Sequence, residues 1–167
     1  MAFAPIRGRF EHPTLYGDAL RIGIYDALYT RPGDYLVLET GIWFIASQDR
    51  FLPSLCVETN RTISIARPGQ PLTVGANAYA GITTGTTVGV TGDWPASVLG
   101  ISGSGINPAG LPTDLSVPYW TVLLPPIPTV TLQVSDLVSD DLGRSGVVAA
   151  AELTRLGWRL TVKEATA

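Results

Sequence analysis

Glycine and proline interrupt this chain every few positions, with 18 glycines and 13 prolines among 167 residues. Both residues mark turns and end regular structure, so the segments between them suit short strands better than long helices. The apolar runs in those segments are rich in β-branched and aromatic residues, which pack well on a pleated surface. We therefore expect an all-β fold, either a small β-barrel or a β-sandwich.

Alternation of apolar and polar residues identifies the clearest strands. Isoleucines alternate with hydroxyl residues in 61–65, and 158–162 has the same period of two, which turns one face of each strand toward a core. Segments 14–29 and 146–156 stay open, because either could form a short helix. The full set of candidate strands is 20–25, 34–38, 42–47, 55–58, 61–66, 86–90, 97–101, 120–124, 129–134, 147–150 and 158–162.

A shift in composition around Pro68 divides the chain. We expect an N-terminal arm at 1–13, a first β module at 14–68, a loop-rich extended insertion at 69–118 and a second β module at 119–167. The insertion is rich in Gly, Thr, Ser and Pro and carries very few charges. Because a freely solvated coil normally carries more charge, we interpret the insertion as an arm that orders against a neighbouring molecule.

The charge balance favours a protein that binds other proteins. Charged residues make up 15% of the chain and hydrophobic residues 46%. Interface cores are depleted of charged residues, so the low charge suits a protein whose surface is partly covered by neighbouring subunits. The alternative is a compact, loop-rich monomer. The net charge is −3, and the ten arginines and one lysine are scattered singly. Nucleic-acid binding needs a basic stripe, so we expect no nucleic-acid partner.

Cys56 is the only cysteine, which excludes an intrachain disulfide and a zinc site built from cysteines. Its apolar neighbours Leu55 and Val57 favour a buried thiol. The first ten residues lack the apolar core of a secretory signal, and no stretch reaches the ~20 apolar residues of a membrane span. We expect a protein that is made in the cytoplasm and has no membrane partner.

The sequence contains no convincing catalytic motif. His12, the only histidine, lies beside Pro13 in the expected arm and would have to be the base of any serine triad. Asp140 and Asp141 are adjacent, so a strand would point them to opposite faces, and a turn before Gly143 suits them better. We predict no catalytic residue, no metal ligand and no cofactor, and therefore no enzyme.

Three aromatic residues form the candidate interface: Trp94 precedes a proline, and Tyr119 and Trp120 follow one. Aromatic residues at loop edges serve as anchors for protein partners or as stacking platforms for sugars. A carbohydrate- or receptor-binding β-module is therefore an alternative function, and it requires the three rings to be exposed together. An enzyme, the third hypothesis, would need a cleft that joins His12 or a pair of carboxylates.

A short pattern occurs twice in the chain. Asp34 begins an apolar run and is followed by Gly41, and Asp136 and Gly143 have the same spacing. An apolar strand follows each glycine, and each copy closes with one of the two alternating strands described above. Aspartate suits the first turn and glycine the hairpin. The pattern predicts a three-stranded meander used twice, in two small barrels or in two halves of one sandwich.

The C-terminal copy, 134–164, resembles the end of the head–tail joining proteins of tailed phages, which are small β-barrels of the virion neck. Those proteins usually end with an aspartate turn, a glycine, an apolar strand and a strand of the W-x-L-x-V kind. The matching pieces here are Ser135-Asp136-Leu137-Val138, Asp141-Leu142-Gly143, Val147-Val148-Ala149 and Trp158-Arg159-Leu160-Thr161-Val162. More broadly, the chain looks like structural proteins of tailed phages, prophages and gene transfer agents. Joining proteins are usually shorter, carry one barrel and have no counterpart of the Gly/Thr-rich middle.

The resemblance implies a non-enzymatic structural protein of the virion, assembled in the host cytoplasm. The most direct interpretation is a ring-forming adaptor of the neck, the head–tail junction or the tail. Its partners would be further copies of itself in a homo-oligomeric ring and neighbouring virion proteins, contacted through the arm and the edge strands.

Overall fold

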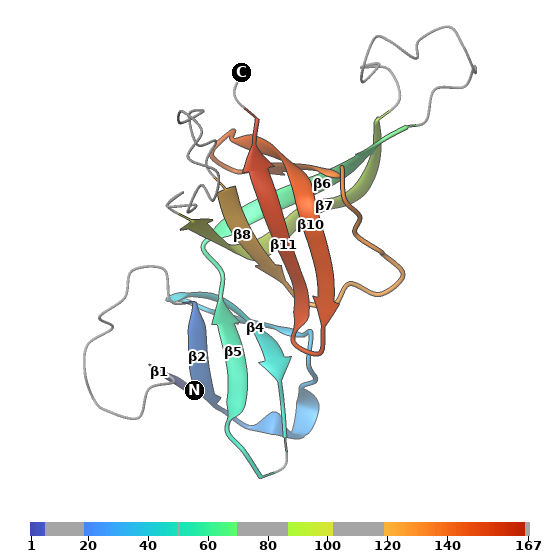
Figure 1. The fold of residues 1–167 in the computed structure, drawn as a ribbon. Helices are drawn as coiled ribbons and strands as arrows, with labels where there is room; N and C mark the ends of the chain where they lie inside the picture. The colour runs from blue at the N-terminus through green and yellow to red at the C-terminus, as the bar shows by residue number, and fades with distance from the viewer. Residues whose placement is uncertain (6–18, 50, 70–86, 102–118, 166–167) are drawn as a thin grey trace, which may run out of the picture.

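The structure is a computed structural model, and it describes residues 1–5, 19–49, 51–69, 87–101 and 119–165. Over these residues the chain is all-β, as the sequence predicts, with one 3-10 turn, η1 (Ala27–Tyr29). The strands form two units: a curled five-stranded sheet and a closed six-stranded barrel. Figure 1 shows the barrel above the sheet, with strand β5 leading from the sheet up into the barrel.

The five-stranded sheet has the order β1-β2-β5-β4-β3, with all neighbours antiparallel. Its strands are β1 (Ala2–Pro5), β2 (Leu20–Ile24), β3 (Tyr35–Leu38), β4 (Gly41–Ser47) and β5 (Ser54–Glu58). The sheet curls strongly: Phe3 on β1 stacks on Trp43 of β4 with ring centroids 4.4 Å apart, although two strands separate them. The curl encloses a small core in which Ile45 and Cys56 are completely buried.

The barrel has the order β10-β11-β8-β7-β6-β9, and β9 pairs with both β6 and β10 to close it. Its strands are β6 (Arg61–Pro68), β7 (Thr87–Ile101), β8 (Tyr119–Leu124), β9 (Leu137–Asp140), β10 (Ser145–Thr154) and β11 (Gly157–Glu164). Ile63 and Ile65 face inward and are each 1% exposed, and Leu160 and Val162 are completely buried. The alternation in the sequence therefore correctly identified the core faces of β6 and β11.

A second apolar layer and a few polar contacts join the sheet to the barrel. Phe44 and Val57 of the sheet pack in one cluster with Leu99 and Leu123 of the barrel. Only two residues separate β5 from β6, and the side chain of the second, Asn60, bonds to both backbone groups of Val98 at 2.8 and 2.9 Å. The two units therefore share an apolar junction fixed at its rim by hydrogen bonds.

The repeated pattern folds as two equivalent meanders, β3-β4-β5 and β9-β10-β11. In the first copy, Ile45 N donates to Asp34 O at 3.0 Å; in the second, Val148 N donates to Asp136 O at 2.8 Å. The residue before each aspartate has a positive φ and donates its own N–H to the same strand residue. The register of each ladder then shifts immediately after Ile45 and after Val148. The two turns and the two bulges therefore match bond for bond.

The boundaries differ from those expected. The first module was expected at 14–68 with 61–66 as its closing strand, but β6 pairs with β7 and β9 in the barrel, and the sheet ends at Glu58 with β5 as the third strand of its meander. The expected insertion at 69–118 contains β7, a fifteen-residue strand of the barrel. The expected arm at 1–13 contains β1 in its described part, and residues 6–13 lie outside the described residues.

Two local expectations are also resolved. Segment 146–156 is strand, because it forms most of β10 and the turn to β11. Segment 129–134 is not a strand: Thr129 has a positive φ, no described strand pairs with the segment, and Leu132 is 3% exposed against the barrel core. Within the described residues, the structure has no helix with the length and apolar character needed to cross a membrane.

Candidate interaction surface

The structure does not bring the three predicted interface aromatics together. Trp120 lies inside the barrel, is 3% exposed and has the Arg144 guanidinium 4.7 Å from its ring centre. Tyr119 precedes it on the same strand, is 37% exposed and faces the opposite side because strand side chains alternate. Trp94 is partly buried against the barrel core. The shared platform that a sugar-binding module requires is therefore absent from these three residues.

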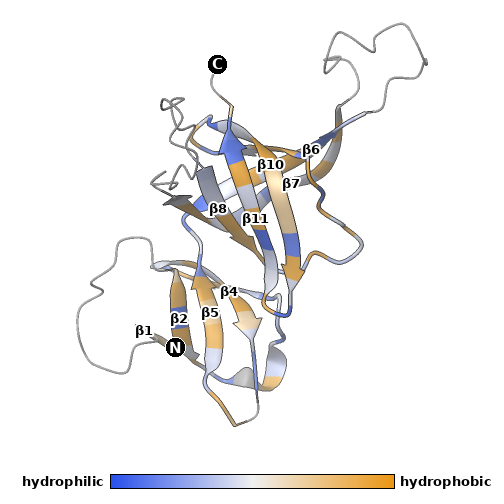
Figure 2. Cartoon of the chain, in the orientation of Figure 1, coloured by the Kyte–Doolittle hydropathy of each residue, from blue (hydrophilic) through white to orange (hydrophobic). Residues whose placement is uncertain are grey.

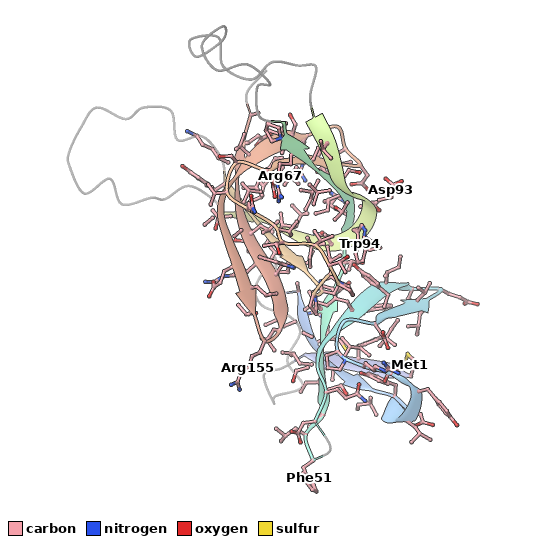
Figure 3. All side chains as sticks on the ribbon, turned by 90° about the vertical axis from the view of Figure 1, so that its right-hand side faces the viewer. Met1, Phe51, Arg67, Asp93, Trp94 and Arg155 are labelled. Atoms are coloured by element: carbon pink, nitrogen blue, oxygen red, sulfur yellow. The ribbon has the colours of Figure 1, made fainter. Side chains whose placement is uncertain are left out.

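Trp94 instead contributes to the junction between the sheet and the barrel (Figure 3). The rings of Trp94 and Tyr35 lie 6.1 Å apart, and Tyr35 Oη donates to the Pro95 carbonyl oxygen at 2.7 Å. Burial raises the pKa of Tyr35, so its hydroxyl remains protonated and keeps donating at neutral pH. These contacts hold β3 close to the barrel.

A cavity of about 290 Å³ lies at the same junction. The walls are mostly apolar and come from both units: Leu20, Phe44, Ala46 and Val57 from the sheet, and Leu123, Leu124, Leu156 and Trp158 from the barrel side. Arg159 and Thr154 provide polar atoms at this site, and no described carboxylate or histidine lines it. The cavity is therefore an apolar hollow between the two units.

Four strongly exposed apolar residues lie at the end of the sheet farthest from the barrel. We call Leu28, Tyr29, Phe51 and Leu52 the apolar tip; they are 76%, 85%, 89% and 68% exposed. Leu28 and Tyr29 belong to η1, and the other two lie in the loop between β4 and β5. Figure 1 shows both segments at the bottom of the sheet, Figure 2 colours the loop as hydrophobic, and Figure 3 places Phe51 at the extreme end.

Local hydrogen bonds hold the apolar tip in place. Asp26 Oδ1 accepts from Leu28 N at 3.1 Å, and Asp49 Oδ1 accepts from Phe51 N at 2.9 Å. Thr30 Oγ1 lies 3.3 Å from Gln48 Oε1, which links η1 to the end of β4. The sequence pattern does not predict this surface, because pairs of apolar residues between polar ones have no periodicity. The aspartate two residues before each exposed pair was the available signal.

The buried charged residues of the barrel are structural. Asp136 is 1% exposed and accepts from Arg67 Nε at 2.7 Å, from Arg67 Nη2 at 2.9 Å and from Gln133 N at 2.8 Å. The hydrogen bonds to Asp136 raise the pKa of Arg67. Figure 3 shows Arg67 at the upper end of the barrel. This ion pair ties β6 to the turn before β9 and so fastens the strand that closes the barrel.

Asp140 and Asp141 occupy the turn that the sequence predicts for them. Asp140 Oδ1 accepts from Leu142 N at 3.1 Å and from Arg144 N at 2.8 Å, and Arg144 Nε donates to Asp140 Oδ2 at 2.8 Å. Burial raises the pKa of Asp140, but the hydrogen bonds and charge of Arg144 outweigh it, and the pKa ends below its usual value. The Asp140 carboxylate therefore stabilises the turn, whereas the Asp141 carboxylate lies 4.0 Å from Arg61 Nε on β6.

The described residues offer no assembled reactive group. Cys56 is completely buried, and burial raises the pKa of its thiol, so the reactive thiolate is scarce at neutral pH. No three potential ligands among the described His, Cys, Asp and Glu residues could hold a metal ion together. His12 lies outside the described residues.

Comparisons with known proteins add no relative: no family model, no curated protein and no solved structure matches the chain. The described structure is that of an all-β protein with a closed barrel, a related sheet and an exposed apolar tip.

Proposed function

We propose that this chain is a non-enzymatic structural protein of a virion, an adaptor that joins neighbouring proteins at the neck, the head–tail junction or the tail. The observation that carries the proposal is the apolar tip. Four large apolar side chains, each at least 68% exposed, lie on two segments at the same end of the sheet, and hydrogen bonds fix both segments. Soluble monomers rarely expose such patches, and they usually mark sites of protein contact.

The distribution of open and closed edges supports the same role. The barrel uses both edges of all six strands, whereas the outer edges of β1 and β3 in the sheet pair with no described strand. Open edges attract further strands, and proteins normally cover or blunt them. A closed barrel joined to a sheet with unpaired described edges and an apolar tip is suited to binding neighbouring proteins through the sheet. Contacts between unlike surfaces of identical copies close into rings when the rotation permits.

Light scattering on the full chain and on a double variant of the tip, Leu28→Ser with Phe51→Ser, tests the proposal. We expect the unchanged protein to form a ring-sized oligomer, or to join purified phage particles, and the variant to do neither. Both side chains are exposed, so the variant should keep its melting temperature. Leu153→Ser, which changes a 58% exposed leucine on the barrel, is the matched control and should assemble normally. Assembly of the tip variant at the unchanged level would contradict the proposal.

A further inference from the structure

The equivalence between the sheet and the barrel extends beyond the repeated meander. In the sheet, β2 and then β1 continue from β5, just as β8 and then β7 continue from β11 in the barrel. The registers agree too, so that Phe3 of β1 takes the place that Val98 has on β7, facing the core. Chain order also matches, from β1 to β5 and from β7 to β11. Strand β6 and the part of β7 that pairs with it, Thr87–Ala96, have no counterpart among the described residues of the sheet.

Among the described residues, nothing takes the place of β6, and one edge of β3 therefore has no neighbouring strand. In the barrel, β6 closes the structure by pairing with β9, with Ile65 opposite Val138. Residue for residue, the edge of β9 that β6 covers corresponds to the outer edge of β3. Ile45 N donates to Asp34 O, and backbone direction alternates along an antiparallel strand. The N–H and C=O groups of Tyr35 and Val37 therefore point away from β4, and no described strand pairs with them.

A carboxylate marks the end of this open edge. Asp34 is the counterpart of Asp136, and both accept a hydrogen bond at 2.8 Å from the backbone N–H three residues earlier. Asp136 is buried under Arg67, the arginine of the closing strand. Asp34 is exposed, and no described cation pairs with it. Within the described residues, the sheet thus keeps the carboxylate that would accept an arginine but has no strand that supplies one.

Apolar side chains along the open edge of β3 are also less buried than their counterparts in the barrel. Val37 is 74% exposed on one face of β3. On the other face, Leu38 on β3 and Phe3 on β1 are only partly buried against the inner core. In the barrel, the matching space is filled by Ile63 and Ile65 of β6, each 1% exposed. An added strand with apolar residues at alternate positions would cover Leu38 and Phe3 on the core face in the same way, and its intervening residues would lie beside Val37 on the other face.

We propose that the outer edge of β3 is a strand-addition site that binds an extended segment of a partner protein, antiparallel to Tyr35–Leu38. The segment carries two branched aliphatic residues at alternate positions and an arginine two residues later, as Ile63, Ile65 and Arg67 do in β6. The arginine binds Asp34. Main-chain hydrogen bonds supply affinity, and the alternating side chains and the arginine supply specificity.

The occupant is a different protein from this one. Strand β6 of a second copy is paired on both edges inside its own barrel, so it cannot be donated without opening that barrel. The inference deepens the proposed assembly role and relies on it only for the identity of the partner as a neighbouring structural protein. The geometry of the edge stands on the comparison of the two units alone.

The sequence of β6 supplies the probe: a synthetic peptide of residues 61–68, titrated into the full chain by calorimetry and amide NMR. We expect binding with shifts centred on the Tyr35 and Val37 amides. Arg67→Ala in the peptide, or Asp34→Asn in the protein, should weaken binding about tenfold, as expected for a lost charge-assisted pair. The two changes together should weaken it no further than either alone. Glu39→Gln, which removes the same charge from the neighbouring turn, should leave the affinity unchanged.

Val37→Pro tests the edge itself, because proline removes an N–H that faces the added strand while edge strands tolerate proline. The peptide should no longer bind this variant, and the melting temperature should stay unchanged. Absence of peptide binding to the unchanged protein, or binding indifferent to Asp34, overturns the proposal. Self-association that Val37→Pro abolishes would overturn the choice of a foreign partner. Peptide affinity does not depend on particle assembly, so failure here and failure of the tip variant in assembly are separate results.

Discussion

The two equivalent aspartates provide a stability test with an internal control. Asp136→Ala removes three hydrogen bonds from a carboxylate that is 1% exposed, two of them from the Arg67 guanidinium. Asp34→Ala removes one bond from an exposed carboxylate in the same turn of the other meander. If the ion pair closes the barrel, the first substitution must cost much more than the second.

The expected losses follow from the number and burial of those bonds. Hydrogen bonds to charged groups contribute roughly 1.5–3 kcal/mol each, but water can hydrate Arg67 in the variant because its side chain is 35% exposed. We therefore expect Asp136→Ala to lose about 3 kcal/mol. The exposed bond of Asp34 should be worth about 0.5–1 kcal/mol. For a chain of this length, 3 kcal/mol corresponds to a melting temperature about 6–12 °C lower.

Urea unfolding followed by tryptophan fluorescence is a suitable assay, because Trp120 and Trp158 are buried in the barrel and report its opening. Arg67→Ala should lose at least as much as Asp136→Ala, since it leaves a buried carboxylate without its cation. Equal losses for Asp34→Ala and Asp136→Ala would refute the reasoning that the ion pair fastens the closing strand.

Three further predictions concern single residues. The pKa of Asp140 is lowered in the fold, so its stabilisation is present at neutral pH and is lost as the pH falls below the ordinary value of 3.8. Urea titrations at pH 7 and pH 3 should show a smaller acid loss for Asp140→Asn, and an unchanged loss would refute this. Cys56 should react with a thiol reagent only in unfolded protein, because it is completely buried; rapid reaction of the native protein would contradict its placement. Gly157→Ala should lower the free energy of unfolding by about 3 kcal/mol or more, because a Cβ there would meet Leu124 O at 2.2 Å and φ is +120°. Gly143→Ala should lower it by only about 1 kcal/mol, because φ is +78° but the space around the residue is open. Similar losses for the two glycine variants in urea unfolding would count against the packing at the hairpin.

The sequence predicted those parts of the fold that depend on local pattern. Alternation located β6 and β11 and their core faces, because one buried face imposes a period of two. The aspartate and glycine spacing predicted the first two strands of each meander and all three strands of the second, because the hairpin after the first strand needs a glycine with a positive φ. These features require only a few neighbouring residues. The closing strand predicted for the first copy, 61–66, is β6 of the barrel, and β5 takes its place.

Features that depend on distant partners were not predictable in this way. Strand β6 follows β5 after two residues, and nothing in its own sequence reveals that its partners are β7 and β9. Segment 129–134 has the composition of a strand, but none of the described strands pairs with it. The position of Tyr119 and Trp120 at a loop edge suggests one shared surface, although adjacent strand residues face opposite sides. The strand period itself predicts that only one of the two side chains faces the core, and that residue is Trp120.

The most direct test of the central claim is quantitative mass spectrometry of purified tailed particles from a host that carries this gene. We expect the chain to be present in washed particles at a fixed number of copies relative to the major capsid protein. We also expect the tip variant, Leu28→Ser with Phe51→Ser, to be missing from them. Particles without the chain, together with a stable free monomer in the lysate, would contradict the assembly role.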